Sequence, residues 1–184
     1  MIRTDTTLLL DEDKILNLND IKRLSLKTYR RFEWTEDGPD VLWDAITPPP
    51  QAYQYYAEGL LKEDCDGFHA LMHYCLSMNG IKCYLLTATA LGGSHCILLF
   101  YYQNKWYIDD YYNVYGPHDT IQEAVDAYNI IFADHYNTDS EVFSNEYVEY
   151  DYKKGKFHRT TQRKIMDQIE PKQEEEKKPL QTKE

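Results

Sequence analysis

The chain has 184 residues and a formal net charge of -11, with 42% hydrophobic and 14% aromatic residues. This length suits one domain with its own core, and the composition is globular rather than disordered. The acidic excess argues against nucleic-acid binding, since phosphate contacts need a basic surface. No apolar run reaches the ~18 residues of a membrane helix, and the N-terminal residues lack the pattern of a secretory signal. We therefore expect a cytoplasmic protein without membrane contact.

The four cysteines lie 10, 8 and 13 positions apart, at Cys65, Cys75, Cys83 and Cys96. These spacings match no zinc motif. Without a secretory signal, the thiols are expected to stay reduced in the cytosol. We interpret them as free and mostly buried thiols, and we expect neither a metal nor an organic cofactor.

The first third of the chain favours short elements separated by loops. An apolar run at residues 7–10 predicts an edge strand. A helix is expected over residues 19–31, capped by the Asn or Asp (Asn19 or Asp20) with which it begins. Glycine and proline indicate a loop over residues 33–50. A short helix follows over residues 51–61.

The middle of the chain has the clearest periodicity. From Cys65 onward apolar residues recur at helical spacing, and the pair Asn79-Gly80 indicates the end of this helix. Apolar and β-branched residues then predict three strands separated by turns. These strands are expected over residues 81–90, 95–102 and 106–112.

The last third predicts one helix, one strand and a tail. A Thr-x-x-Glu capping box indicates the start of a helix over residues 120–133. A strand is expected over residues 142–152. From about residue 165 the chain is charged and has almost no apolar residues, which is typical of disorder. The predicted organisation is a domain over residues 1–164 and a disordered tail over residues 165–184.

Cys65 is the residue whose predicted position favours reactivity. It lies in the first turn of a helix that follows a loop, where exposed N–H groups and the helix dipole stabilise a thiolate. A nearby imidazole would add a thiolate–imidazolium pair. His95 opens a strand directly after a Gly-Gly-Ser turn, where small residues leave room for a substrate backbone. We therefore predict Cys65 as a nucleophile and His95 as its base.

An aspartate near the end of the next strand can complete a triad. If residues 103–104 form a two-residue turn, Ile97 faces Asp110, and Asp110 shares a face with His95 because side chains alternate along a strand. A three-residue turn would place Asp109 there instead. Either carboxylate could hold the imidazole in one tautomer and stabilise its cation.

His69 and His73 offer a competing interpretation. At i and i+4 they share one face of the predicted helix, a geometry that can bind zinc. The glutamate of a zinc hydrolase is absent, because position 70 is alanine, and no third ligand is evident. We interpret them as a satisfied or exposed pair, and a role near the substrate stays open. The tyrosine clusters are expected to be half-buried residues, some of which could line a cleft.

Taken together, these motifs resemble the transglutaminase-like superfamily, a branch of the papain-like cysteine enzymes. The resemblance covers roughly residues 40–112. It is closest to bacterial and phage transglutaminase-like cysteine proteases, which share an acid-Cys-acid signature. The matching segments are Asp64-Cys65-Asp66-Gly67-Phe68, Asn79-Gly80-Ile81, Ser94-His95 and Lys105-Trp106-Tyr107-Ile108-Asp109-Asp110.

The resemblance implies an α+β papain-like fold, with the catalytic cysteine at the N-terminus of a central helix packed on an antiparallel sheet. The family's aspartate commonly lies four residues after its tryptophan, which falls on Asp110. Papain-like enzymes often complete the oxyanion hole with an upstream Gln or Trp, and Gln54 and Trp43 are the candidates here. No metal or cofactor is implied. The expected substrate is a protein or peptide.

The implied activity is acyl transfer through a thioester on Cys65. Members of the superfamily hydrolyse or transamidate peptide, isopeptide or side-chain amides, and the motif does not choose between water and an amine as acceptor. Two other functions remain open. The chain could be a catalytically silent binding protein on the same fold, or an acidic interaction protein such as an inhibitor or a nucleic-acid mimic.

Overall fold

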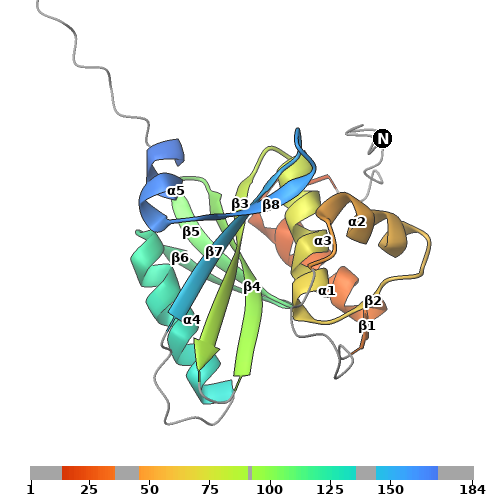
Figure 1. The fold of residues 1–184 in the computed structure, drawn as a ribbon, viewed down its shortest axis with the longest axis horizontal. Coiled ribbons are helices and arrows are strands. Elements are labelled where there is room, and N and C mark those ends of the chain that lie inside the picture. Colours follow the sequence, from red (N-terminus) through yellow and green to blue (C-terminus); the bar gives the residue numbers. More distant parts are fainter. Residues whose placement is uncertain (1–13, 36–45, 91–92, 136–143, 170–184) are drawn as a thin grey trace, which may run out of the picture.

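The computed structural model describes residues 14–35, 46–90, 93–135 and 144–169. They form an α+β structure whose helices cover both faces of an antiparallel sheet (Figure 1), which confirms the predicted fold class. In chain order the elements are α1 (Leu18–Arg31), β1 (Glu33–Trp34), α2 (Pro49–Ala57), β2 (Lys62–Glu63), α3 (Cys65–Met78), β3 (Lys82–Ala90), β4 (Gly93–Tyr102), β5 (Lys105–Asp110), β6 (Asn113–His118), α4 (Ile121–His135), β7 (Ser144–Asp151), β8 (Lys156–Thr160) and α5 (Gln162–Ile169).

The main sheet has six strands in the order β6-β5-β4-β3-β7-β8, and every neighbouring pair is antiparallel. Helices α1, α2 and α3 lie on one side of it, and α4 and α5 lie on the other (Figure 1). Each side encloses its own hydrophobic core. None of the helices in the described ranges is long and apolar enough to cross a membrane.

Helix α3 is the central helix. Every residue from Asp66 to Leu76 is buried, because the helix packs against β3 and β4 on one side and against α2 on another. The helix ends at Asn79, followed by Gly80 at φ +75°. Glycine adopts this left-handed conformation without steric cost, and the predicted C-terminal cap is confirmed.

The hairpin of β4 and β5 has the predicted two-residue turn. Gln103 and Asn104 adopt φ values of 50° and 61°, the left-handed pair of the turn type that suits the twist of a hairpin. Tyr102 therefore pairs with Lys105, and Leu98 pairs with Asp109. The register on which the Asp110 prediction depends is confirmed.

Some predicted elements need correction. Helix α1 is capped by Asn17, not by Asn19 or Asp20, because Asp20 is the third helical residue and completes a capping box with Asn17. Four further strands were not predicted, namely β6 and β8 of the main sheet and the two-residue strands β1 and β2. The edge strand expected at residues 7–10 lies outside the described residues.

The predicted start of the tail at residue 165 falls inside helix α5. Ile165 is fully buried in the core on the α4 side, and Met166 and Ile169 pack against that core. Three apolar side chains at this spacing form one helix face, which is enough to dock a short helix in an otherwise charged segment. Residues 170–184 lie outside the described residues.

The two histidines of α3 are buried side chains bonded within the protein. His73 Nδ1 lies 3.0 Å from the hydroxyl of Tyr152 and 3.3 Å from that of Ser77. His69 bonds to the backbone at both ring nitrogens. Burial lowers the pKa of each imidazole to about 4. Among the described residues no three His, Cys, Asp or Glu side chains form a metal-binding group.

Replacing Ile165 with alanine should lower the free energy of unfolding by about 2–4 kcal/mol, because the side chain is fully buried and leaves a cavity. Urea unfolding followed by circular dichroism measures the change. The exposed neighbour Lys164 provides the control, since Lys164→Ala should change the free energy by less than about 0.5 kcal/mol. Equal effects of the two substitutions would show that α5 does not dock.

His73 should make stability fall as the pH is lowered from 6.5 towards 4. In this window the unfolded chain binds a proton that the buried, neutral imidazole does not, so unfolding is favoured by up to about 3 kcal/mol. His73→Gln should weaken this pH dependence, measured by urea unfolding at pH 7, 6 and 5. Identical curves for the wild-type protein and His73→Gln would contradict the assignment.

Candidate active site

Cys65 is the first residue of α3. The N-cap is Asp64, whose carboxylate accepts a hydrogen bond from the backbone N–H of Asp66 at 3.1 Å. Gly67 allows the side chain of Glu63 to lie against this turn, since a Cβ at position 67 would come within 2.4 Å of it. The sequence thus begins the helix at the cysteine, where the helix dipole stabilises a thiolate.

Cys65 is also the only one of the four cysteines that is partly exposed. Cys75, Cys83 and Cys96 are buried. Burial raises the pKa of Cys83 to about 12, and burial together with the nearby charge of Cys65 raises the pKa of Cys96 well above its usual value. Buried thiols with raised pKa values are unreactive at neutral pH.

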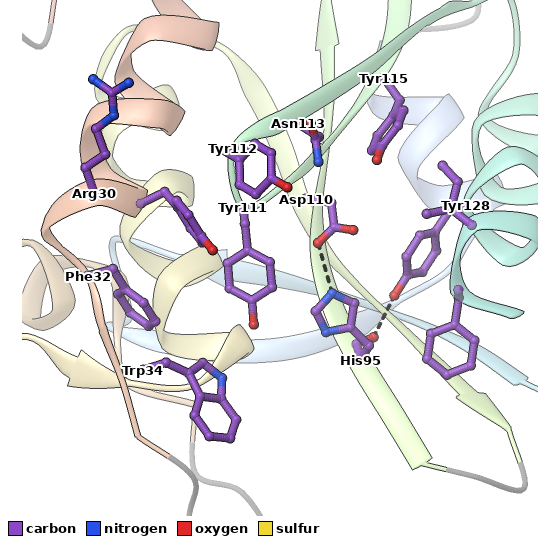
Figure 2. Close-up of a pocket in the computed structure, with 13 residues that line it drawn as sticks. Arg30, Phe32, Trp34, His95, Asp110, Tyr111, Tyr112, Asn113, Tyr115 and Tyr128 are labelled. Atoms are coloured by element: carbon purple, nitrogen blue, oxygen red, sulfur yellow. Dashed lines mark hydrogen bonds and ion pairs between the residues drawn. The ribbon is translucent and has the colours of Figure 1, made fainter. Parts of the chain in front are cut away.

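His95 and Asp110 meet on adjacent strands. The imidazole Nε2 lies 3.0 Å from Asp110 Oδ1 (Figure 2), and the two side chains are 11% and 17% exposed. His95 lies near the start of β4 and Asp110 ends β5, so the two-residue turn brings them to the same end of the hairpin. The structure therefore brings together two of the three residues of the predicted triad by direct contact.

Asp109 has a different environment. Its side chain is fully buried, and Oδ1 lies 2.5 Å from the hydroxyl of Ser25 on α1. Burial raises the pKa of this carboxyl well above its usual value. The alternative register, in which Asp109 would contact His95, does not occur in the structure.

His69 connects the first turn of α3 to the end of β5. Its Nδ1–H donates to the carbonyl oxygen of Cys65 at 2.6 Å, and its Nε2 accepts from the backbone N–H of Tyr111 at 3.2 Å. The ring centroid lies 6.1 Å from that of His95. A single neutral imidazole thus links the nucleophile candidate to the residue that follows Asp110.

Tyr111 covers His95. Its ring stacks on the imidazole with a centroid distance of 5.6 Å and an interplanar angle of 29°. The Trp34 side chain hydrogen bonds to it, and burial together with the nearby charges of Cys65 and Asp110 raises its pKa. Its φ of 54° is uncommon for a residue with a large side chain. Strained backbone of this kind persists where surrounding contacts hold it, here the N–H bond to His69.

Helix α4 supports His95 from the other side. The hydroxyl of Tyr128 donates to the backbone carbonyl of His95 at 2.9 Å, and the two rings lie 6.4 Å apart. Figure 2 shows this bond next to the bond between His95 and Asp110. The histidine is therefore held through both its backbone and its ring.

A cavity of about 770 Å³ opens at His95 and Asp110. Its walls come from α1 and β1 on one side and from α4 on the other, with the hairpin end between them (Figure 2). Cys65 is not among the residues that line the cavity, although its charge contributes to the raised pKa of the lining residue Tyr111. The lining residues are Tyr29, Arg30, Phe32, Trp34, His95, Asp110, Tyr111, Tyr112, Asn113, Tyr115, Tyr128, Ile131 and Phe132.

Of the two oxyanion-hole candidates, Gln54 is not brought to this cavity. Gln54 is exposed on α2, where its amide donates to Glu58 Oε1 at 3.0 Å. It does not line the cavity. Trp43 lies outside the described residues. A side-chain donor for an oxyanion therefore stays a prediction.

Three residues of the site had no specific role in the sequence-based prediction. His69 was considered only together with His73, because its spacing from His73 is local whereas its contact to Tyr111 spans 42 positions. Trp34 and Tyr128 gave no signal of their own. The tyrosines after Asp110 were noted as residues that could line a cleft, and Tyr111 and Tyr112 do so.

No protein-family model matches the chain, and no curated protein matches it in sequence. Among solved structures, calcium-bound LapG of Legionella pneumophila is similar with a TM-score of 0.43 and 18% identity, covering 56% of this chain and 59% of LapG. EGTA-treated LapG of the same organism is similar with a TM-score of 0.42 and 18% identity, covering 56% of this chain and 57% of LapG. A structure from Cytophaga hutchinsonii, described as a candidate cysteine protease, is similar with a TM-score of 0.41 and 18% identity, covering 54% of this chain and 33% of that protein. The chain thus spans less than two thirds of each of these proteins, and the similarity concerns part of the backbone arrangement.

Proposed function

We propose that the chain is a cysteine-dependent acyl-transfer enzyme in which Cys65, His95 and Asp110 act as nucleophile, base and orienting carboxylate. The observation that carries the proposal is the 3.0 Å bond between His95 Nε2 and Asp110 Oδ1 at the cavity. A carboxylate in this position fixes the tautomer of the imidazole and stabilises its cation. The partly exposed thiol at a helix N-terminus supplies the nucleophile.

The bond to Asp110 also gives the two ring nitrogens of His95 different roles. Since Nε2 faces the carboxylate, Nδ1 is the nitrogen that would take the proton of Cys65. The thiolate then attacks the carbonyl carbon of an amide, and the imidazolium gives its proton to the leaving amine. The acyl group stays on sulfur as a thioester. His95 next activates water, or an acceptor amine, which attacks the thioester and releases Cys65.

The proposed substrate is a peptide or protein amide, including isopeptide and side-chain amides. Its chemistry needs no metal, since the thiolate is the nucleophile and the imidazole moves the protons. The scissile carbonyl would lie near the N-terminus of α3, where backbone N–H groups of the first turn can stabilise an oxyanion.

Cys65 should react with iodoacetamide at neutral pH at least tenfold faster than any other cysteine of the protein. The other three thiols are buried, and the helix N-terminus and His95 favour the Cys65 thiolate. Peptide mass spectrometry over a time course locates the label. Cys65→Ser controls for the assignment, and His95→Gln should slow the labelling by removing the imidazolium partner. Equal slow labelling of all four thiols would favour a catalytically silent or purely interacting protein.

Asp110→Asn should lower the rate of the chemical step by roughly a hundredfold or more, about 2.7 kcal/mol of barrier. The amide keeps the shape but favours the wrong imidazole tautomer and removes the charge that stabilises the cation. Asp109→Asn is the matched control, because this neighbour faces Ser25, and it should cost less than about tenfold. Single-turnover rates on a peptide amide measure both. A reversed order would assign the third role to Asp109, and two small effects would leave a Cys–His pair.

A further inference from the structure

The exposed aromatic side chains gather in one place. Among the described residues the large hydrophobic side chains that are exposed include three aromatics, Tyr29, Trp34 and Tyr112, which are 42%, 57% and 49% exposed. All three line the cavity at His95. The other exposed hydrophobics are aliphatic, namely Leu16, Leu26, Leu60 and Ile130. A cluster of exposed aromatics inside one cavity indicates a binding surface rather than scattered surface residues.

We propose that the α1–β1 wall of this cavity, formed by Tyr29, Phe32 and Trp34, is a subsite for an aromatic side chain of a peptide substrate. The inference rests on the proposed function and adds a substrate class to it. Tyr29 and Tyr112 already pair at 4.7 Å with an interplanar angle of 54°, and both side chains stay exposed enough to contact a further aromatic ring. Trp34 presents the most exposed ring of the wall.

The position of this wall next to the His95–Asp110 pair suits a side chain that adjoins the scissile amide. In Figure 2 Trp34 and Phe32 lie on one side of the His95 ring, and Tyr128 lies on the other. An extended peptide that crosses the His95–Asp110 pair would direct successive side chains alternately to the two walls. A volume of about 770 Å³ accommodates an aromatic side chain together with the adjoining backbone.

The charges around the cavity restrict the neighbours of that aromatic residue. Arg30 is the one lysine or arginine among the lining residues, and Figure 2 shows its guanidinium pointing away from His95. Asp110 contributes a carboxylate, so the formal charges of Arg30 and Asp110 cancel within the lining, while the chain as a whole carries a net charge of -11. The field of this net charge attracts cationic and repels anionic ligands. The proposed occupant is therefore an aromatic residue flanked by basic rather than acidic residues.

Binding to the full-length Cys65→Ala variant tests the subsite without turnover. Isothermal titration would compare a peptide carrying Phe between lysines with the same peptide carrying Ala, and with Phe between glutamates. The Phe–Lys peptide should bind about tenfold or more tightly than either of the others. Equal affinities, or no binding of any peptide, would overturn the inference.

Two substitutions in the same background locate the preference. Trp34→Ala should reduce the advantage of Phe over Ala to less than about threefold, and Trp34→Phe should retain most of it, because the ring is what binds. Leu60→Ala, at an equally exposed side chain outside the cavity, should change nothing. A full preference for Phe in Trp34→Ala would place the aromatic ring elsewhere and overturn the inference.

The outcome separates the subsite from the chemistry. Selective binding of the Phe–Lys peptide, combined with slow and unselective labelling of Cys65, would support the aromatic subsite and contradict the proposed enzyme activity. Fast labelling of Cys65, combined with equal binding of the Phe and Ala peptides, would support the enzyme activity and contradict the subsite.

Discussion

The hydrogen bonds of His69 fix how the central helix meets the end of the hairpin. The ring donates to the carbonyl of Cys65 and accepts from the N–H of Tyr111, so it needs its hydrogen on Nδ1 and a bare Nε2. Only the neutral imidazole meets both needs, and complete burial keeps it neutral by lowering its pKa. The separation between Cys65 and the Asp110–Tyr111 segment is thus set by one side chain that is not itself part of the proposed chemistry.

The two hydrophobic cores hold the other side of this arrangement in place. Strand β4 sends Cys96, Leu98 and Phe100 into the core beneath α3, and Ile97 and Leu99 into the core beneath α4. Burying a large apolar side chain is worth about 1.5–3 kcal/mol, so the strand is anchored from both faces. His95 lies near the start of this strand, and its position is therefore determined by packing on both faces of the sheet.

The features that the sequence predicted well are those with local signals. The two-residue turn after Tyr102 sets the register that makes Asp110 rather than Asp109 the partner of His95. The residues alone left the length of this turn open, and the Trp-to-Asp spacing of the resemblance favoured Asp110. Likewise, an Asn-Gly pair indicates the end of α3. Helix α5 was missed because its apolar face is short and its partners, such as Tyr84, lie far away in sequence. The role of His69 depends on a contact of the same non-local kind.

The residues of the proposed chemistry and the residues of the cavity walls come from different parts of the chain, which affects how such proteins diverge. The residues of the proposed chemistry and their link come from one continuous stretch, from Asp64 to Tyr111. The walls of the cavity come mainly from elements before and after it, α1 with β1 and α4. Substitutions in these outer elements can therefore reshape what enters the cavity while the stretch between them stays constant. Homologues should vary most in the walls, so that one reaction could be directed to new ligands by changes at the two flanks.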